Sequence, residues 1–325
     1  MRLLVFDAWP GEHAICGSGL GSSLLKLPAL ADARAAGHEV SVLSSPPRAE
    51  LLACAPVVGR SFGDPGQVPW DAYEALIPFG VTVPAALRAD PRLRAGPRPA
   101  ARLKADYDLV PHVSFWRGLM ASALGAPSPT TPASMSVTPS AAGLAWARAR
   151  LPCDRPVVAL SLSALTNLKR YQRWSEVARG LRRALPEARI VLVGQEAPGP
   201  EFPDDLLDLT RGTTLELLVA VVASCAVVAG TDGLVTNLAV ACGRPTVALF
   251  TVIRPDFVID PGLALSAPAR GLTHPGCPLQ PCYARLGDYR TAACPLDPAL
   301  GPTAPPRCAD FDPDAVVAAI AALSP

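Results

Sequence analysis

One acidic residue lies where a strand is expected to turn into a helix. Asp232 belongs to the run Thr231–Gly233, which follows the short apolar stretch Ala226–Gly230 and precedes a second apolar stretch. This pattern predicts a buried strand, a sharp turn and a helix. Backbone N–H groups at a helix start bind anions such as nucleotide phosphates, and a carboxylate beside them can orient those donors or hold a ligand hydroxyl. Turn chemistry alone equally allows an ordinary turn with Asp232 as the N-cap.

A second carboxylate follows another apolar run. Glu196 comes two residues after the expected strand Arg189–Gly194. Ligands of open α/β sheets gather at the carboxyl ends of the strands, and a carboxylate there can accept hydrogen bonds from ribose hydroxyls. Taken alone, Glu196 is equally a surface acid.

The loop after the first expected strand, Arg2–Phe6, holds three residues that could remove a proton. Glu12 and His13 have pKa ranges suited to general-base work, and Asp7 lies nearer the strand end. We place Glu12 and His13 ahead of Asp7. The alternative for each is a solvated loop residue.

The nine cysteines fall into two groups. Five are scattered, mostly within apolar segments, and fit small buried side chains: Cys16, Cys54, Cys153, Cys225 and Cys242. The other four lie in a proline-rich tail with gaps of four, eleven and thirteen residues: Cys277, Cys282, Cys294 and Cys308. Four thiolates can hold zinc or iron tetrahedrally. Two disulfides and free buried thiols are the alternatives.

The elements that must position these residues alternate between strand and helix. A strand at Arg2–Phe6, a helix at Ser23–Ala36 and a strand at Glu39–Leu43 form a parallel α/β unit. The hydroxyl-rich start at Thr213 and Thr214 predicts a capped helix. Further strands are expected at Ala75–Ile77, Pro156–Leu162 and Thr246–Phe250, and further helices at Ala141–Leu151 and Pro313–Leu323.

Two segments resemble one known family. Residues Thr214–Phe250 resemble the motif T-x-LEELxAxxxxAxxVxGxDSGxxHLAxAxGxPTVALF of heptosyltransferase-type, nucleotide-sugar glycosyltransferases, and Gly21–Leu30 resembles its GDxLxTLPAL segment. The resemblance implies an α/β fold with two Rossmann-like domains facing across a cleft (GT-B). An acceptor-binding domain would span 1–140, and a nucleotide-sugar-binding domain with the cysteine-rich tail would span 141–325. The implied activity is inverting transfer of a sugar from an ADP-heptose-like donor to an acceptor hydroxyl.

The resemblance also assigns the donor site. Lys169 corresponds to the family lysine on the donor diphosphate, with Arg170 as its neighbour and fallback, and Glu196 and Asp232 complete the site. Further donor-binding candidates are Thr166, Gly233, Leu234, Thr236 and Asn237. A lysine at a helix start is mildly unfavourable beside the helix dipole, which favours an anionic ligand there.

Three positions depart from the family pattern. Gly233-Leu234 replaces its Ser/Thr-Gly, Asn237 replaces its His, and Ser22 replaces the Asp regarded as its catalytic base. A serine hydroxyl cannot accept a proton near neutral pH without a partner. Either another group acts as the base or the acceptor differs. A branch of the family that modifies autotransporters carries cysteine-held iron, with a different spacing.

Composition limits the partners. A net charge of +1 argues against a general nucleic-acid binder. The run Arg88–Lys104 has six basic residues and one acid, as in a solvated loop or a surface for an anionic acceptor. The acceptor remains open among carbohydrate, glycolipid, protein and nucleic acid.

The stretch Gly118–Ala147 has the composition of a domain boundary. With no signal peptide or membrane span expected, we predict a cytoplasmic protein.

Catalysis is expected to need no cofactor, because Lys169 and the N–H groups at a helix start can stabilise the charge of the diphosphate. A structural zinc or iron is the metal that the four tail cysteines could hold. Two alternatives to a transferase with an ADP-heptose-like donor remain. One is a non-catalytic nucleotide-sugar binding protein, which Ser22 favours. The other is a glycosyltransferase acting on modified bases of viral DNA, which the basic run favours.

Overall fold

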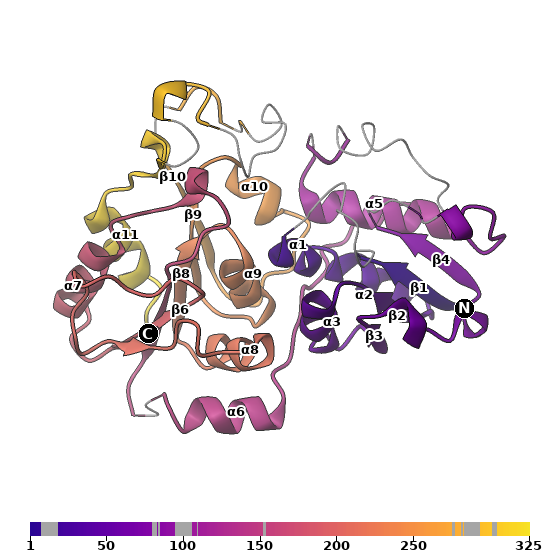
Figure 1. Ribbon diagram of the computed structural model, residues 1–325, viewed down its shortest axis with the longest axis horizontal. Coiled ribbons are helices and arrows are strands. Elements are labelled where there is room, and N and C mark those ends of the chain that lie inside the picture. Colours follow the sequence, from indigo (N-terminus) through magenta and orange to yellow (C-terminus); the bar gives the residue numbers. More distant parts are fainter. Residues whose placement is uncertain are drawn as a thin grey trace. The chain divides into compact units, whose positions relative to one another are not determined.

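The computed structural model describes residues 1–7, 19–79, 83, 85–94, 106–108, 110–151, 154–274, 277–280, 282, 293–300 and 304–325. The chain forms two compact units (Figure 1). Unit 1 comprises Met1–Thr138 and Asp256–Ala264, and unit 2 comprises Pro139–Pro255 and Leu265–Pro325. The short segment Asp256–Ala264 therefore belongs to unit 1, although unit 2 surrounds it in the sequence.

Unit 1 is built on a parallel sheet of four strands in the order β3-β2-β1-β4. Its strands are β1 (Arg2–Phe6), β2 (Glu39–Leu43), β3 (Arg60–Phe62) and β4 (Ala75–Pro78). The helices are α1 (Leu20–Leu24), α2 (Leu27–Ala35), α3 (Pro46–Ala53) and α5 (His112–Leu124). Strands β1 and β4 are almost entirely buried, as expected for a parallel sheet with helices on its faces.

The segment Asp256–Ala264 is fastened to unit 1 by polar contacts. The Asp260 carboxylate accepts hydrogen bonds from the Ser114 backbone N–H (2.9 Å) and hydroxyl (3.0 Å), near the start of α5. Ala133 forms a short parallel bridge with Leu263. Because Asp260 is buried, these bonds replace the water that its carboxylate and the first turn of α5 would otherwise need.

Unit 2 is built on a parallel sheet of six strands in the order β10-β9-β8-β5-β6-β7. The strands are β5 (Val157–Ser161), β6 (Arg189–Val193), β7 (Leu207–Asp208), β8 (Val227–Thr231), β9 (Thr246–Phe250) and β10 (Ala269–Thr273). The helices are α6 (Ala141–Arg148), α7 (Trp174–Ala184), α8 (Leu215–Ala223), α9 (Leu234–Ala241), α10 (Pro255–Val258, whose first residue alone belongs to this unit) and α11 (Pro313–Ala321).

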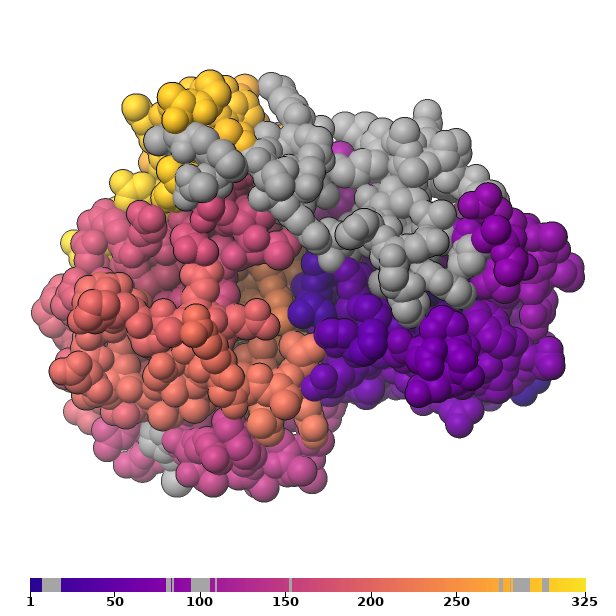
Figure 2. Space-filling view, in the orientation of Figure 1, coloured from indigo at the N-terminus to yellow at the C-terminus, as the bar shows by residue number. Residues whose placement is uncertain are grey.

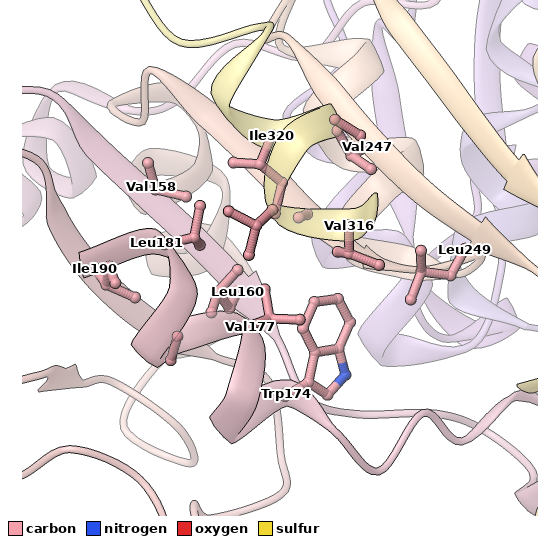
Figure 3. Close-up of a cluster of buried hydrophobic side chains, with 14 of the residues drawn as sticks. Val158, Leu160, Trp174, Val177, Leu181, Ile190, Val247, Leu249, Val316 and Ile320 are labelled. Atoms are coloured by element: carbon pink, nitrogen blue, oxygen red, sulfur yellow. The ribbon is translucent and has the colours of Figure 1, made fainter. Parts of the chain in front are cut away.

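The core of unit 2 lies between this sheet and the helices α7 and α11. Figure 3 shows Trp174, Val177 and Leu181 of α7 directed toward side chains of the sheet and of α11. Val316 and Ile320 of α11 are fully buried, and Val317 is nearly so. The expected last helix is therefore present, and its apolar side chains pack on the body of unit 2. It brings the end of the chain against the domain that is expected to bind the donor.

Most expected elements agree with the structure. The α/β fold class is confirmed, since both units have parallel sheets with helices. One expected helix, Ser23–Ala36, is instead divided into α1 and α2. Pro28 lies in the first turn of α2, where its missing N–H leaves no hydrogen bond unmade, so a new helix can start there. The stretch Gly118–Ala147 has α5 and α6 at its two ends, and the division between the units, at Thr138–Pro139, falls between these helices.

Candidate functional site

The strand order of unit 2 brings three strand ends together. Strand β5 lies between β8 and β6, so the residues that follow it, Ser163–Arg170, reach the carboxyl ends of both neighbours. We call this segment the β5 turn. It contains a short 3-10 helix, Asn167–Lys169. Ligands of parallel sheets bind at this edge, and the candidate residues of unit 2 gather there.

Lys169 is joined to the end of β8. Its ammonium group donates hydrogen bonds to the Asp232 carboxylate and to the Asp232 backbone carbonyl oxygen. Both side chains are largely shielded, with 15% and 8% of their area exposed. The aspartate fixes the position of the lysine ammonium group, and an ammonium group is a common binding group for phosphate.

Arg170 is joined to the end of β6. Its guanidinium donates a hydrogen bond of 3.0 Å to Glu196 Oε1, and both side chains remain about one third or more exposed. The Ser163 hydroxyl oxygen accepts hydrogen bonds from the backbone N–H groups of Gln195 (2.6 Å) and Glu196 (3.1 Å). Ser163 therefore fixes the turn that carries Glu196.

A glycine is required at the base of that turn. Gly194 has φ of 112°, which side chains of L-residues rarely adopt, and an added Cβ would lie 2.5 Å from Ser163 Oγ. The close approach of Ser163 and the conformation of Gly194 together direct Glu196 toward the β5 turn.

The start of α9 differs from a simple aspartate cap. The N-cap is Gly233, and the Thr236 hydroxyl accepts a hydrogen bond of 3.1 Å from the Gly233 N–H. Asp232 instead holds Lys169. The first turn of α9 contains the candidates Leu234 and Thr236, with Asn237 directly after them, and Thr236 and Asn237 are buried. Helix geometry leaves the first N–H groups of α9 without intrahelical acceptors at the place where Lys169 is bound.

Thr166, at the start of the 3-10 helix, has a buried hydroxyl without a hydrogen-bond partner among the described residues. Only 6% of its area is exposed. Buried hydroxyls usually have a partner, because leaving one unpaired costs roughly 1–3 kcal/mol. This orphaned group lies three residues from Lys169 and is a further polar atom that a ligand at the β5 turn can satisfy.

In unit 1, Asp7 lies at the end of β1 inside a buried ionic cluster. Its carboxylate pairs with Lys26 (2.6 Å) and Arg48 (3.6 Å), and it accepts hydrogen bonds from Ser23 (2.8 Å) and Ser44 (2.7 Å). Burial alone would raise the pKa of Asp7, but the charges of Lys26 and Arg48 outweigh it and lower the pKa to about 2. So weakly basic a carboxylate is poorly suited to remove a proton from a hydroxyl.

The other base candidates give less geometric information. Ser22 lies in α1, is partly exposed, and is adjacent to the Ser23 that binds Asp7. Glu12 and His13 lie outside the described residues. Sequence reasoning missed the contribution of Lys26 and Arg48, because nothing in their spacing shows that both face the end of β1.

In the described part of the basic run, Arg88 and Arg92 bind groups of unit 1 itself. The Arg92 guanidinium pairs with Asp90 at 2.7 Å and donates to the backbone carbonyl of Trp70. Arg88 donates to the carbonyl of Val83. Backbone hydrogen bonds of Arg92 and Arg94 with Leu76 hold the segment against β4. The rest of the run, 95–104, lies outside the described residues.

The four tail cysteines lie near one another. Burial, together with the neighbouring thiols of Cys277, Cys282 and Cys294, raises the pKa of the Cys308 thiol to about 12. Among the residues that the structure describes, no three His, Cys, Asp or Glu side chains are arranged to hold a metal ion. The tail itself packs on unit 2, since the Tyr171 hydroxyl donates to the Phe311 carbonyl (3.1 Å). Figure 2 shows the yellow C-terminal atoms against this part of the unit.

Comparison with known proteins identifies the family of this chain. A family model described as glycosyltransferase family 9 (heptosyltransferase) matches residues 87–275. Comparison with curated proteins gave no match.

Solved structures with a similar fold include three enzymes from E. coli. The ADP-heptose LPS heptosyltransferase II has a TM-score of 0.63 and 17% identity, with 99% of this chain and 98% of that chain covered. The heptosyltransferase WaaC with ADP-2-deoxy-2-fluoro heptose has a TM-score of 0.53 and 18% identity, with 85% of this chain and 94% of that chain covered. The iron-containing dodecameric glycosyltransferase TibC from strain H10407 has a TM-score of 0.63 and 16% identity, with 99% of this chain and 75% of that chain covered. These matches support the expected GT-B fold.

Within the described parts of the chain, the structure contains no helix that is both apolar enough and long enough to span a bilayer.

Proposed function

Because this chain belongs to glycosyltransferase family 9, the heptosyltransferase family, we propose that it is an inverting transferase with an ADP-heptose-like donor and an acceptor hydroxyl. The observation that carries this proposal is the pairing of Lys169 with Asp232 beside the start of α9. The heptosyltransferases of similar fold have ADP-heptose in their descriptions or an ADP-heptose analogue bound. A nucleotide-sugar donor is made in the cytoplasm, so a cytoplasmic location is part of the proposal.

In this proposal the donor diphosphate binds between Lys169 and the first turn of α9. Lys169 supplies a positive charge, and the amide N–H groups at the helix start supply hydrogen bonds to phosphate oxygens. The orphaned Thr166 hydroxyl gains a partner on the ligand. Glu196, whose turn Ser163 fixes, is assigned to the ribose hydroxyls, with Arg170 completing its ion pair.

Gly233, Leu234, Thr236 and Asn237 have supporting roles in the proposal. Thr236 and the extended Gly233 form the cap that keeps α9 directed at the ligand. Leu234 and Asn237 lie in or directly after the first turn, and the family's own side chains at these positions differ. We therefore expect the backbone of this turn, more than its side chains, to contact the donor.

The transfer step forms one bond and breaks another. The acceptor oxygen attacks the anomeric carbon from the side opposite the diphosphate, a glycosidic C–O bond forms, and the C–O bond to the β-phosphate breaks. The nucleoside diphosphate leaves with the electron pair, which Lys169 and the α9 start stabilise. The acceptor proton passes to a base, for which we propose Glu12 or His13, since the low pKa of Asp7 makes it a weak base.

A donor screen tests the proposal. We expect one of ADP-, UDP-, GDP- or dTDP-sugars to raise the melting temperature of the full chain, because a ligand that binds only the folded state stabilises it. Transfer is then measured as release of the nucleoside diphosphate with candidate acceptor glycans. Absence of a shift with all four donor classes contradicts the assignment.

We also propose that the four tail cysteines hold a structural zinc or iron. The packing of Cys282 and Cys294 in one cluster supports this, and TibC, of similar fold, is described as iron-containing. The thiols would have to close around the ion, since they are not arranged as a metal site among the described residues. Elemental analysis of purified protein is expected to give one zinc or iron per chain. Full reactivity of all four thiols with a thiol reagent in the native, metal-free protein contradicts it.

A further inference from the structure

Part of the cysteine-rich tail contacts the β5 turn and the end of β9, the strand next to β8. Leu279, Gln280 and Cys282 pack against the end of β9 and against the β5 turn. We call these three residues the tail anchor. All of these contacts lie within unit 2.

Gln280 fixes the segment that leaves β9. Its side-chain amide donates hydrogen bonds to the backbone carbonyls of Phe250 (3.4 Å) and Ile253 (3.1 Å). Phe250 is the last residue of β9, and β9 pairs with β8, the strand that ends beside Asp232. The Gln280 amide therefore bridges the turn that follows β9. This turn is next to the end of β8, where Asp232 binds Lys169.

Cys282 joins that turn to the lysine. Its side chain is 8% exposed and packs with the buried Leu168 and Val252, while Leu279 and Cys294 cover the same cluster. Leu168 directly precedes Lys169, and Val252 lies between the two carbonyls that Gln280 binds. The sulfur is thus a packing contact shared by the β5 turn and the β9 end.

The β5 turn carries Lys169 on a segment with little regular structure. Its 3-10 helix is one turn long, and its N-cap residue, Thr166, makes no side-chain capping bond. Tight transition-state binding requires charged groups to be held to within a fraction of an ångström.

From these contacts we propose that Gln280 and Cys282 are positioning residues for the nucleotide site. They act through Lys169 by holding the β5 turn against the end of β9. The inference rests on the proposed function, because it concerns the same site. It assigns the cysteine-rich tail a role in donor affinity that does not depend on a metal ion.

The first test replaces the hydrogen-bond donor. Gln280→Met keeps the length and neutrality of the side chain but removes the amide. We expect about tenfold weaker binding of the tightest-binding nucleotide among ADP, UDP, GDP and dTDP, because the amide no longer holds the two carbonyls; tenfold corresponds to about 1.4 kcal/mol. Hydrogen exchange should become faster in peptides covering the β5 turn and residues 250–253 and stay unchanged in the rest of unit 2.

The second test separates packing from metal ligation at Cys282. Cys282→Ala should weaken nucleotide binding, and Cys282→Val, which restores apolar volume without a thiol, should recover most of it. Loss of binding in both variants shows that the thiol itself is needed and overturns the packing role. Leu296→Ala, at an exposed position of the same tail, is the matched control and should bind like the unsubstituted chain.

The outcomes distinguish this inference from the proposed function. If the unsubstituted chain binds a nucleotide and Gln280→Met binds it equally well, the inference alone is overturned. Faster exchange spread over all of unit 2 also overturns it, because that result indicates a general stabilising role. If the unsubstituted chain binds none of the four nucleotides, the proposed function fails and the inference fails with it.

Discussion

Lys169→Met is expected to lower kcat/KM for the donor by about 10²–10³-fold, the usual effect of removing one group that stabilises developing charge. The substitution keeps the chain length of the side chain and removes its charge. The diphosphate then loses its fixed cation next to the start of α9, so donor binding should weaken as well. Steady-state kinetics and nucleotide titration measure the two effects separately.

Two controls accompany this variant. Lys169→Met leaves the mostly buried Asp232 carboxylate without this cation, which lowers stability for reasons unrelated to the donor. The double variant Lys169→Met/Asp232→Asn removes the stranded charge, so its stability should recover while its donor affinity does not. Arg182→Ala removes an exposed cation of the same unit and should leave both properties unchanged. Unaltered donor binding by Lys169→Met contradicts the assignment of this lysine.

Asp7→Asn is expected to lower the free energy of unfolding by about 3–5 kcal/mol. The substitution is nearly isosteric, but it leaves Lys26 and Arg48 buried without the carboxylate that neutralises them. The contacts of the Lys26 ammonium with the carbonyl of Phe79 (3.3 Å) and the ring of Trp116 do not neutralise its charge. Urea denaturation of the full chain measures the change. Asp154→Asn, which breaks an exposed pair with Arg155, is the control and should have no measurable effect.

The pH dependence of this difference provides an independent check. The charges of Lys26 and Arg48 lower the pKa of Asp7 from 3.8 to about 2 against the effect of burial, so the folded state favours the ionised carboxylate. This contribution, about 2 kcal/mol, is complete above pH 4 and disappears as the pH falls through 2. The difference in stability between the unsubstituted chain and Asp7→Asn should therefore shrink over that range. A constant difference contradicts the ion-pair account.

Local sequence patterns predicted the strands of both units well. The ends of β1 and β9 coincide with the apolar runs, because a buried parallel strand needs only a short unbroken run of such residues. The proximity of Lys169 to Asp232 also follows from pattern, since both residues come after strands of one parallel sheet. Their direct bond required the strand order, which places β5 beside β8.

The features that sequence reasoning missed depend on contacts between distant residues. The position of Asp7 after a strand makes it a candidate base, but its ion pairs with Lys26 and Arg48 lower its pKa, and no periodicity links the three residues. Asp260 binds Ser114 across 146 positions and draws Asp256–Ala264 into unit 1, which no composition change signals. The contacts of Gln280 with the end of β9 are of the same kind, because a single amide in a proline-rich tail has no local pattern.

The central claim is that a nucleotide diphosphate binds at the β5 turn and the start of α9. Hydrogen exchange of the full chain, measured with and without the donor found in the screen, tests this most directly. The account predicts slower exchange in peptides covering residues 163–170, 194–196 and 231–237, and the loss of that protection in Lys169→Met. Donor-dependent protection confined to other parts of the chain, with these three segments unchanged, would contradict it.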